Sequence, residues 1–142
     1  MSKIDNTEIL KSKVMNSTNI SQFIAEHKSS IQSTNFCDSL HNYLDIKQIK
    51  NADFFSRSGL TESYGYQLLN GKRQPSRDKV IQSSIGLSLS ISETNRLLKY
   101  AEKSELYVKN KRDTIIIFAL NNKMNLIEIN DLLDCENCEI LS

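Results

Sequence analysis

Apolar residues recur three and four positions apart along most of this chain, and this spacing predicts a series of short amphipathic helices. Three such stretches come before the middle of the chain, at residues 7–15, 20–28 and 35–45. In the third stretch Phe36, Leu40 and Leu44 would share one face. Because the chain has only 4 Gly and 1 Pro, few residues are available for the turns of β-hairpins. The pattern therefore predicts an all-α fold, a compact helical bundle.

The stretch from Lys50 to Ser76 predicts two short helices separated by a tight turn. Phe54 and Phe55 lie in the first helix, and Gly59 can adopt the positive φ that such a turn requires. Thr61 can cap the next helix through its side-chain oxygen. Two helices joined in this way predict a helix-turn-helix.

The second helix of this pair is predicted at Glu62 to Leu69. Gly71 lies where a left-handed residue would end the helix, and Pro75 prevents the helix from continuing. Gly65 is in the middle of the helix, where glycine costs about 1 kcal/mol relative to alanine. We therefore expect either close packing against the rest of the protein at Gly65 or close approach of the helix backbone to DNA.

Capping signals predict the helices that follow. Ser76 can cap a helix over residues 77–84, which we expect to end at Gly86. Ser90 and Glu93 form a capping box that predicts the start of another helix. Its apolar face would be made by Thr94, Leu97, Leu98 and Ala101.

The segment from Asn110 to Asn122 contains the run TIIIFAL, whose β-branched residues are compatible with a buried strand as well as a helix. Asn110 and Asp113 stand at capping distance and no second strand is predicted to pair with the segment, so we expect a helix. Asn125 and Glu128 predict the start of a last helix. We expect these two helices to form the hydrophobic centre of the bundle or, alternatively, a dimer interface.

Charge is distributed unevenly, although the net charge is only +1. Residues 57–112 contain eleven Lys and Arg against five acidic residues, whereas residues 113–142 contain six acidic residues and a single Lys. Contacts to phosphate need local positive charge, so this division is typical of a nucleic-acid-binding segment followed by a supporting or partner-binding one. The alternative is a solvated surface on which the charges cluster by chance.

Candidates for catalysis or metal binding are few. Cys135 and Cys138 form a C-x-x-C pair, but zinc needs four ligands and the others available are only Cys37, His27 and His41. The acidic surroundings of the pair favour free thiols, with a disulfide in the tail as the alternative. No motif of a nucleotide-binding, metalloprotease or serine-hydrolase site is present, so we predict no enzyme activity, no cofactor and no metal.

A loop with the sequence NGKRQPSRDKV follows the second helix of the pair, at residues 70–80. With this loop, residues 50–101 resemble the λ-repressor-like, or XRE-type, helix-turn-helix family. The shared pattern is a helix, a turn, a recognition helix and a Gly-Lys-Arg-x-Pro-Ser loop that leads into a fourth helix. The segments GLSLSISETNRLLKYA and RDTIIIFALNN resemble one branch of these small bacterial regulators, which also has an N-terminal helical extension.

The resemblance implies three parts of the chain. These are an N-terminal helical extension at 1–34, a DNA-binding domain at 35–104, and C-terminal helices at 105–142 that pack on the core or on a dimer partner. It also implies that the N-terminal part of the recognition helix enters the major groove of double-stranded DNA.

The resemblance, taken with helix geometry, also implies site residues. The positions nearest base edges are Glu62, Ser63, Tyr64, Tyr66 and Gln67. Phosphate contacts are expected from Lys50, Asn51, Lys72, Arg73, Arg77 and Lys79. Gln67 can pair bidentately with adenine, whereas Glu62, where the family often has a basic or neutral residue, can help only by accepting from cytosine N4. Tyr64 and Tyr66 are two residues apart and point to different faces, so we expect one of them to be in the core.

The prediction for function is a sequence-specific DNA-binding protein, a transcriptional regulator of bacterial or phage type that binds as a homodimer to two half-sites. The alternative is a protein-interaction adaptor that uses the helix-turn-helix bundle or the acidic C-terminal helices to hold a partner protein. The longest apolar run, Ile115 to Leu120, is too short to cross a bilayer, and the N-terminus lacks the apolar core of a signal peptide. A cytoplasmic location is therefore expected.

Overall fold

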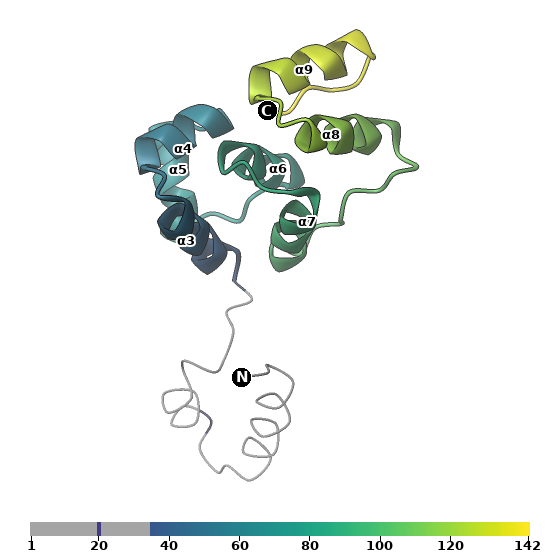
Figure 1. Ribbon diagram of the computed structural model, residues 1–142. Coiled ribbons are helices and arrows are strands. Elements are labelled where there is room, and N and C mark those ends of the chain that lie inside the picture. The colour runs from purple at the N-terminus through teal and green to yellow at the C-terminus, as the bar shows by residue number, and fades with distance from the viewer. Residues whose placement is uncertain (1–19, 21–34) are drawn as a thin grey trace. The chain divides into compact units, whose positions relative to one another are not determined.

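The computed structural model describes Ile20 and residues 35–142, so the helix predicted at 7–15, and all but Ile20 of the one predicted at 20–28, lie outside the described residues. Residues 34–142 form one compact unit. Its described part contains seven α-helices and no strand (Figure 1). They are α3 (Phe36–Lys47), α4 (Asn51–Ser58), α5 (Glu62–Leu69), α6 (Arg77–Gly86), α7 (Ile91–Tyr100), α8 (Lys111–Asn121) and α9 (Leu126–Cys135). The all-α prediction is confirmed for this part of the chain, and the TIIIFAL run is helical.

Side-chain caps begin most of these helices, because the first backbone N–H groups of a helix have no partner within it. The predicted caps of α5, α6, α7, α8 and α9 are all present, made by Thr61, Ser76, Ser90, Asn110 and Asn125. Reciprocal capping boxes join Ser90 to Glu93 and Asn125 to Glu128. The sequence therefore placed these helix starts correctly from local chemistry alone.

Helix α6 occupies the centre of the unit, with α4, α7 and α9 packed against it (Figure 1). Every residue from Val80 to Gly86 is buried. Two serines can lie in this core because their hydroxyls are satisfied within the helix. Ser83 Oγ donates to Lys79 O at 2.8 Å, and Ser84 Oγ donates to Val80 O at 3.1 Å.

Of the two alternatives for the helices at 110–122 and after Asn125, the hydrophobic centre of the bundle does not agree with the structure, in which α6 is central, and a dimer interface stays a prediction. Helix α8 buries Ile116, Ala119 and Leu120 but leaves Phe118 56% exposed. Apolar composition made α8 look central, whereas the more polar α6 is the helix against which α4, α7 and α9 pack.

Gly86 was expected to lie beyond the end of α6, but it is the last residue of the helix. The left-handed residue that ends α6 is Ser88, with φ of 54°. The N–H groups of Ser88 and Leu89 bond to Ile85 O and Ser84 O, in the pattern of a Schellman motif. Gly86 instead permits close contact with α4, since a Cβ there would lie 1.8 Å from Ser58 Oγ.

Two reciprocal ion pairs join the first turn of α6 to the first turn of α8. Arg77 forms a bidentate pair with Asp113, at 2.8 and 2.9 Å, and Arg112 forms a bidentate pair with Asp78, with both bonds at 2.9 Å. Asp113 also accepts from the Tyr107 backbone N–H at 3.0 Å. Four charged side chains thereby hold together the N-terminal turns of two helices that lie more than twenty residues apart in sequence.

The C-terminal residues are tied back to the same unit. Lys111 Nζ donates to Glu136 O at 2.7 Å, and Arg112 Nε donates to Glu139 O at 2.9 Å. Asn130 bonds to both the N–H and the carbonyl of Leu141, whose side chain is buried. Helix α9 also contacts α6, so the acidic end of the chain packs on the unit that contains α4 and α5.

We expect stability to fall in acid partly through Asp113. Burial alone would raise the pKa of this carboxyl, but the hydrogen bonds from Arg77 and from the Tyr107 N–H, with the charges of Arg77 and Arg112, lower it below its usual value. A carboxyl with a lowered folded pKa contributes its full stability above its unfolded pKa of about 4, and loses it as the pH falls through the folded pKa.

The measurement is urea unfolding over a series of pH values, with Asp113→Asn as the control. The free energies of unfolding of wild type and variant should begin to converge as the pH falls below about 4, because protonation of Asp113 removes the charge that the substitution has already removed. A constant difference between the two proteins across that range would contradict the role given to Asp113.

Candidate nucleic-acid interface

The turn between α4 and α5 has the geometry that the sequence predicted. Gly59 ends α4 with φ of 66°, and the Leu60 N–H donates to Phe55 O at 2.9 Å. The Thr61 side chain then accepts from the Tyr64 N–H and begins α5. Only three residues, Gly59 to Thr61, consequently separate α4 from α5.

Two residues distant in sequence support this turn. Gln82 of α6 is buried and donates through Nε2 to Ser58 O at 2.9 Å. Leu126 of α9 lies so close that a Cβ on Gly59 would be 2.5 Å from its Cδ2. Sequence reasoning missed both residues. No local signal could have found them. The pattern around each residue predicts the helix that contains it, but not the segment that its side chain contacts.

The inner face of α5 is set by Gly65 and by the two leucines that follow it. A Cβ on Gly65 would lie 2.3 Å from Phe55 Cε1, so this glycine allows the Phe55 ring of α4 to pack against the α5 backbone. Leu68 and Leu69 are buried on the same helix. Of the two explanations that the sequence left open for Gly65, close packing within the protein is the one that the structure supports.

The outer face of α5 is polar. Glu62 and Ser63 are exposed, Gln67 is half-buried, and Tyr66 is 43% exposed with its ring edge-on to Phe55 at 5.1 Å between centroids. Tyr64 is half-buried and packs against the core. Burial raises the pKa of its hydroxyl more than the charge of Arg73 lowers it. The two tyrosines therefore lie in different environments, Tyr66 toward solvent and Tyr64 toward the following loop.

The loop after α5 is held in a defined conformation. Gly71 has φ of 73°, and the N–H groups of Gly71 and Lys72 bond to Leu68 O and Gln67 O in a Schellman motif. Pro75 is buried and Ser76 caps α6, so the loop is fixed at both ends. Lys72 and Arg73 are exposed between these two anchors.

Arg73 and Lys79 meet the side chains of α5. Arg73 Nε donates to Gln67 Oε1 at 3.0 Å, and Arg73 Cζ lies 5.2 Å from the centroid of the Tyr64 ring. Lys79 Nζ lies 5.4 Å from the same centroid. The structure thus brings together two predicted base-contacting residues, Tyr64 and Gln67, and two predicted phosphate-contacting residues.

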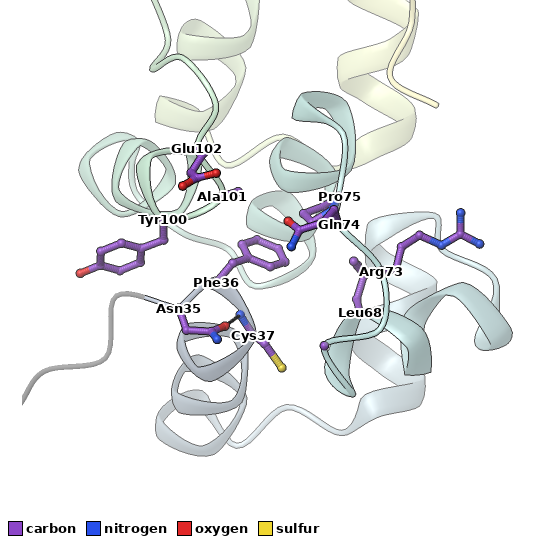
Figure 2. Close-up of a pocket in the computed structure, with 11 residues that line it drawn as sticks. Asn35, Phe36, Cys37, Leu68, Arg73, Gln74, Pro75, Tyr100, Ala101 and Glu102 are labelled. Atoms are coloured by element: carbon purple, nitrogen blue, oxygen red, sulfur yellow. Dashed lines mark hydrogen bonds between the residues drawn. The ribbon is translucent and has the colours of Figure 1, made fainter. Parts of the chain in front are cut away.

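A cleft of about 240 Å³ lies on the other side of this loop, between the start of α3 and the end of α7. Phe36, Pro75 and Tyr100 are among its lining residues (Figure 2). In Figure 2 the Arg73 side chain extends away from Phe36 and Tyr100, which agrees with its bond to Gln67 outside the cleft. The guanidinium of Arg73 therefore belongs to the surface of α5 more than to the cleft.

The remaining predicted phosphate contacts differ in their surroundings. Lys50 and Asn51 are exposed at the N-terminus of α4, which has no side-chain cap bond. Arg77 is directed into the protein, where it pairs with Asp113 and donates to the carbonyls of Ser104 and Glu105. Its guanidinium is therefore engaged within the fold and is not directed toward the surface of α5.

Cys37 and His41, which the sequence left without a role, both reach the C-terminal end of α5. Cys37 Sγ donates to Leu69 O at 2.9 Å, and His41 Nε2 lies 2.7 Å from the same oxygen. Burial, followed by the charge of Asp38, raises the pKa of the Cys37 thiol and keeps it protonated for this bond. These contacts join α3 to the end of α5.

The described residues contain no group of three or more His, Cys, Asp or Glu side chains placed to hold a metal ion. Within that part of the chain Cys135 and Cys138 are free thiols, and no helix is long and apolar enough to span a membrane. No protein-family model, no curated protein and no solved structure matches this chain. The family resemblance noted in the sequence therefore remains a prediction.

Proposed function

We propose that this protein binds double-stranded DNA sequence-specifically, as a transcriptional regulator with a λ-repressor-like helix-turn-helix whose recognition helix is α5. The observation that carries the proposal is the position of Arg73, an exposed cation on a rigid loop that bonds to Gln67 on the outer face of α5. A polar helix face beside a fixed cation is suited to contact base edges and the adjoining backbone together.

The proposal gives the side chains of the α5 surface separate roles. Gln67 would read adenine, Ser63 and Glu62 would face neighbouring bases, and the exposed ring of Tyr66 would contact a thymine methyl. Phosphates would be bound by Lys72, Arg73 and Lys79 beside α5, and by Lys50 and Asn51 at the start of α4. Arg77 is left out of this set because its guanidinium is engaged by Asp113.

The test is selection of bound duplexes from a random DNA pool by the full-length protein at two salt concentrations. Enrichment of a motif with two-fold symmetry would support a dimer on two half-sites. If no sequence is enriched at the lower salt concentration, the proposal fails.

Two substitutions should affect DNA binding in different ways. Gln67→Ala should relax sequence preference by about tenfold at one base pair, because it removes a contact to a base edge. Arg73→Ala should weaken binding to all sequences and reduce the slope of log affinity against log salt by about one, because it removes a phosphate contact. Titrations of labelled duplexes over a salt series measure both effects, and unchanged binding in both variants would contradict these site assignments.

A second candidate function is a protein-interaction adaptor. Two exposed apolar side chains, Phe118 at 56% and Ile127 at 74%, favour it, since both lie in the acidic C-terminal part of the chain. An apolar interface of this kind depends weakly on salt, whereas binding through several phosphates weakens steeply. The salt series therefore separates the two functions.

A further inference from the structure

We infer that Arg73 and Gln67 act as one unit that selects adenine over guanine, with Arg73 as the positioning residue for Gln67. This inference rests on the proposed function, since it specifies how the same surface would read a base. It starts from the bond between Arg73 Nε and Gln67 Oε1, at 3.0 Å.

That bond orients the Gln67 amide. An arginine Nε–H can only donate, so the partner end of the amide must be the oxygen, and turning the amide over would bring two donors together. With Oε1 beside Arg73 and Nε2 on the other side, the amide keeps one free acceptor position and two donors. This arrangement matches adenine, which offers a donor at N6 and an acceptor at N7 in the major groove.

Guanine fits the oriented amide poorly. It presents acceptors at both O6 and N7, so Gln67 Oε1 would face another acceptor. A freely rotating glutamine can escape by directing its NH₂ group to both acceptors, but a glutamine bonded to Arg73 has to break that bond first. The Arg73 contact therefore adds discrimination that Gln67 alone lacks.

The position of Arg73 is itself determined by its surroundings. Its guanidinium lies over the Tyr64 ring, at 5.2 Å from the centroid, and the Schellman motif at Gly71 fixes the loop that carries it. The bond to Gln67 uses only the Nε–H of Arg73, so the two terminal nitrogens of the guanidinium remain available to donate to a phosphate. Contact with phosphate and orientation of the base-reading amide thus come from the same side chain.

Arg73→Lys separates these two roles, because lysine keeps the positive charge but has no donor at the position of Nε. The experiment measures the affinity of the full-length protein for the selected duplex and for one with A·T changed to G·C at the position that Gln67→Ala identifies. We expect the wild type to prefer adenine by about tenfold and Arg73→Lys to reduce this preference to about twofold, with the salt slope unchanged.

Two controls define the result. Lys72→Gln should lower the salt slope by about one and leave the preference for adenine intact, because Lys72 bonds to Gln67 through its backbone N–H and not through its charged side chain. Tyr64→Leu should reduce the preference for adenine and Tyr64→Phe should preserve it, since Tyr64 contacts the Arg73 guanidinium through its aromatic ring and not through its hydroxyl.

The outcomes are distinguishable. A wild-type preference for adenine in Arg73→Lys, with DNA binding retained, would overturn this inference and leave the proposed function standing. Absence of DNA binding by the wild type would overturn both. Circular dichroism of each variant, together with its retained affinity for the selected duplex, shows that a change in preference does not arise from unfolding.

Discussion

Replacing Asp113 by asparagine is expected to lower the free energy of unfolding by about 3 kcal/mol. The substitution keeps the size of the side chain but removes the charge that pairs with Arg77 and that accepts from the Tyr107 N–H. The Asp113 side chain is only 7% exposed, so the Arg77 charge would lose its partner in a position that water reaches poorly. The expected loss is at the lower end for a buried pair because Arg77 itself is 25% exposed.

Asp78→Asn is the matched control. Asp78 occupies the first turn of α6 as Asp113 occupies the first turn of α8, and each carboxylate binds one arginine through two bonds. Helix-dipole and charge changes are therefore similar in the two variants. The Asp78 pair is more exposed, at 26% for Asp78 and 22% for Arg112, so we expect a loss of about 1 kcal/mol.

Urea unfolding near neutral pH, followed by circular dichroism, measures both losses. A larger loss for Asp113→Asn than for Asp78→Asn would attribute the difference to burial of the carboxylate. Equal losses would mean that the two pairs contribute alike and that the burial of Asp113 has no energetic consequence.

Gly65→Ala is expected to destabilise the protein by about 2 kcal/mol, although alanine favours helices. The helical gain is about 1 kcal/mol, whereas forcing a methyl group into a packed contact costs about 3 kcal/mol. The new Cβ would lie 2.3 Å from Phe55 Cε1, and Phe55 is buried and held by the Phe54 and Tyr66 rings. Either the Phe55 ring or α5 itself would therefore have to move to make room for the methyl group.

A double-mutant cycle with Phe55→Leu tests the cause. Leucine is smaller than phenylalanine, so Gly65→Ala should cost about 1 kcal/mol less in the Phe55→Leu background than in the wild type. Ser63→Ala, on the exposed face of the same helix, should change stability by less than about 0.5 kcal/mol. Strictly additive effects of the two substitutions would show that the Phe55 contact is not the source of the loss.

The agreement between the sequence and the fold is closest where the relevant chemistry is local. Thr61, Ser90 and Asn125 cap the helices that their side chains predicted, because each satisfies N–H groups two or three residues further along the chain. Gly59 adopts the positive φ expected of it. Gln67 and Arg73 could be named as candidates from the sequence because they belong to one continuous stretch of helix and loop, but the bond between them was not predicted.

The sequence did not show partners that lie far apart along the chain. Arg77, expected to bind phosphate, pairs with Asp113, which lies 36 positions further along the chain. Gly86, expected to end a helix, serves contact with Ser58 of α4. In both cases the residue type was interpreted by its commonest local use, whereas the partner that determines its role comes from another helix.

By itself the sequence determined the helices, their caps and the turn between α4 and α5, because backbone hydrogen bonding is satisfied within a few residues. The tertiary structure alone decided that α6 lies at the centre and that Gln82 and Leu126 support the turn. It also decided which of the basic residues are directed outward. These features depend on which surfaces pack together, and packing joins side chains whose distance along the chain carries no information about their contact.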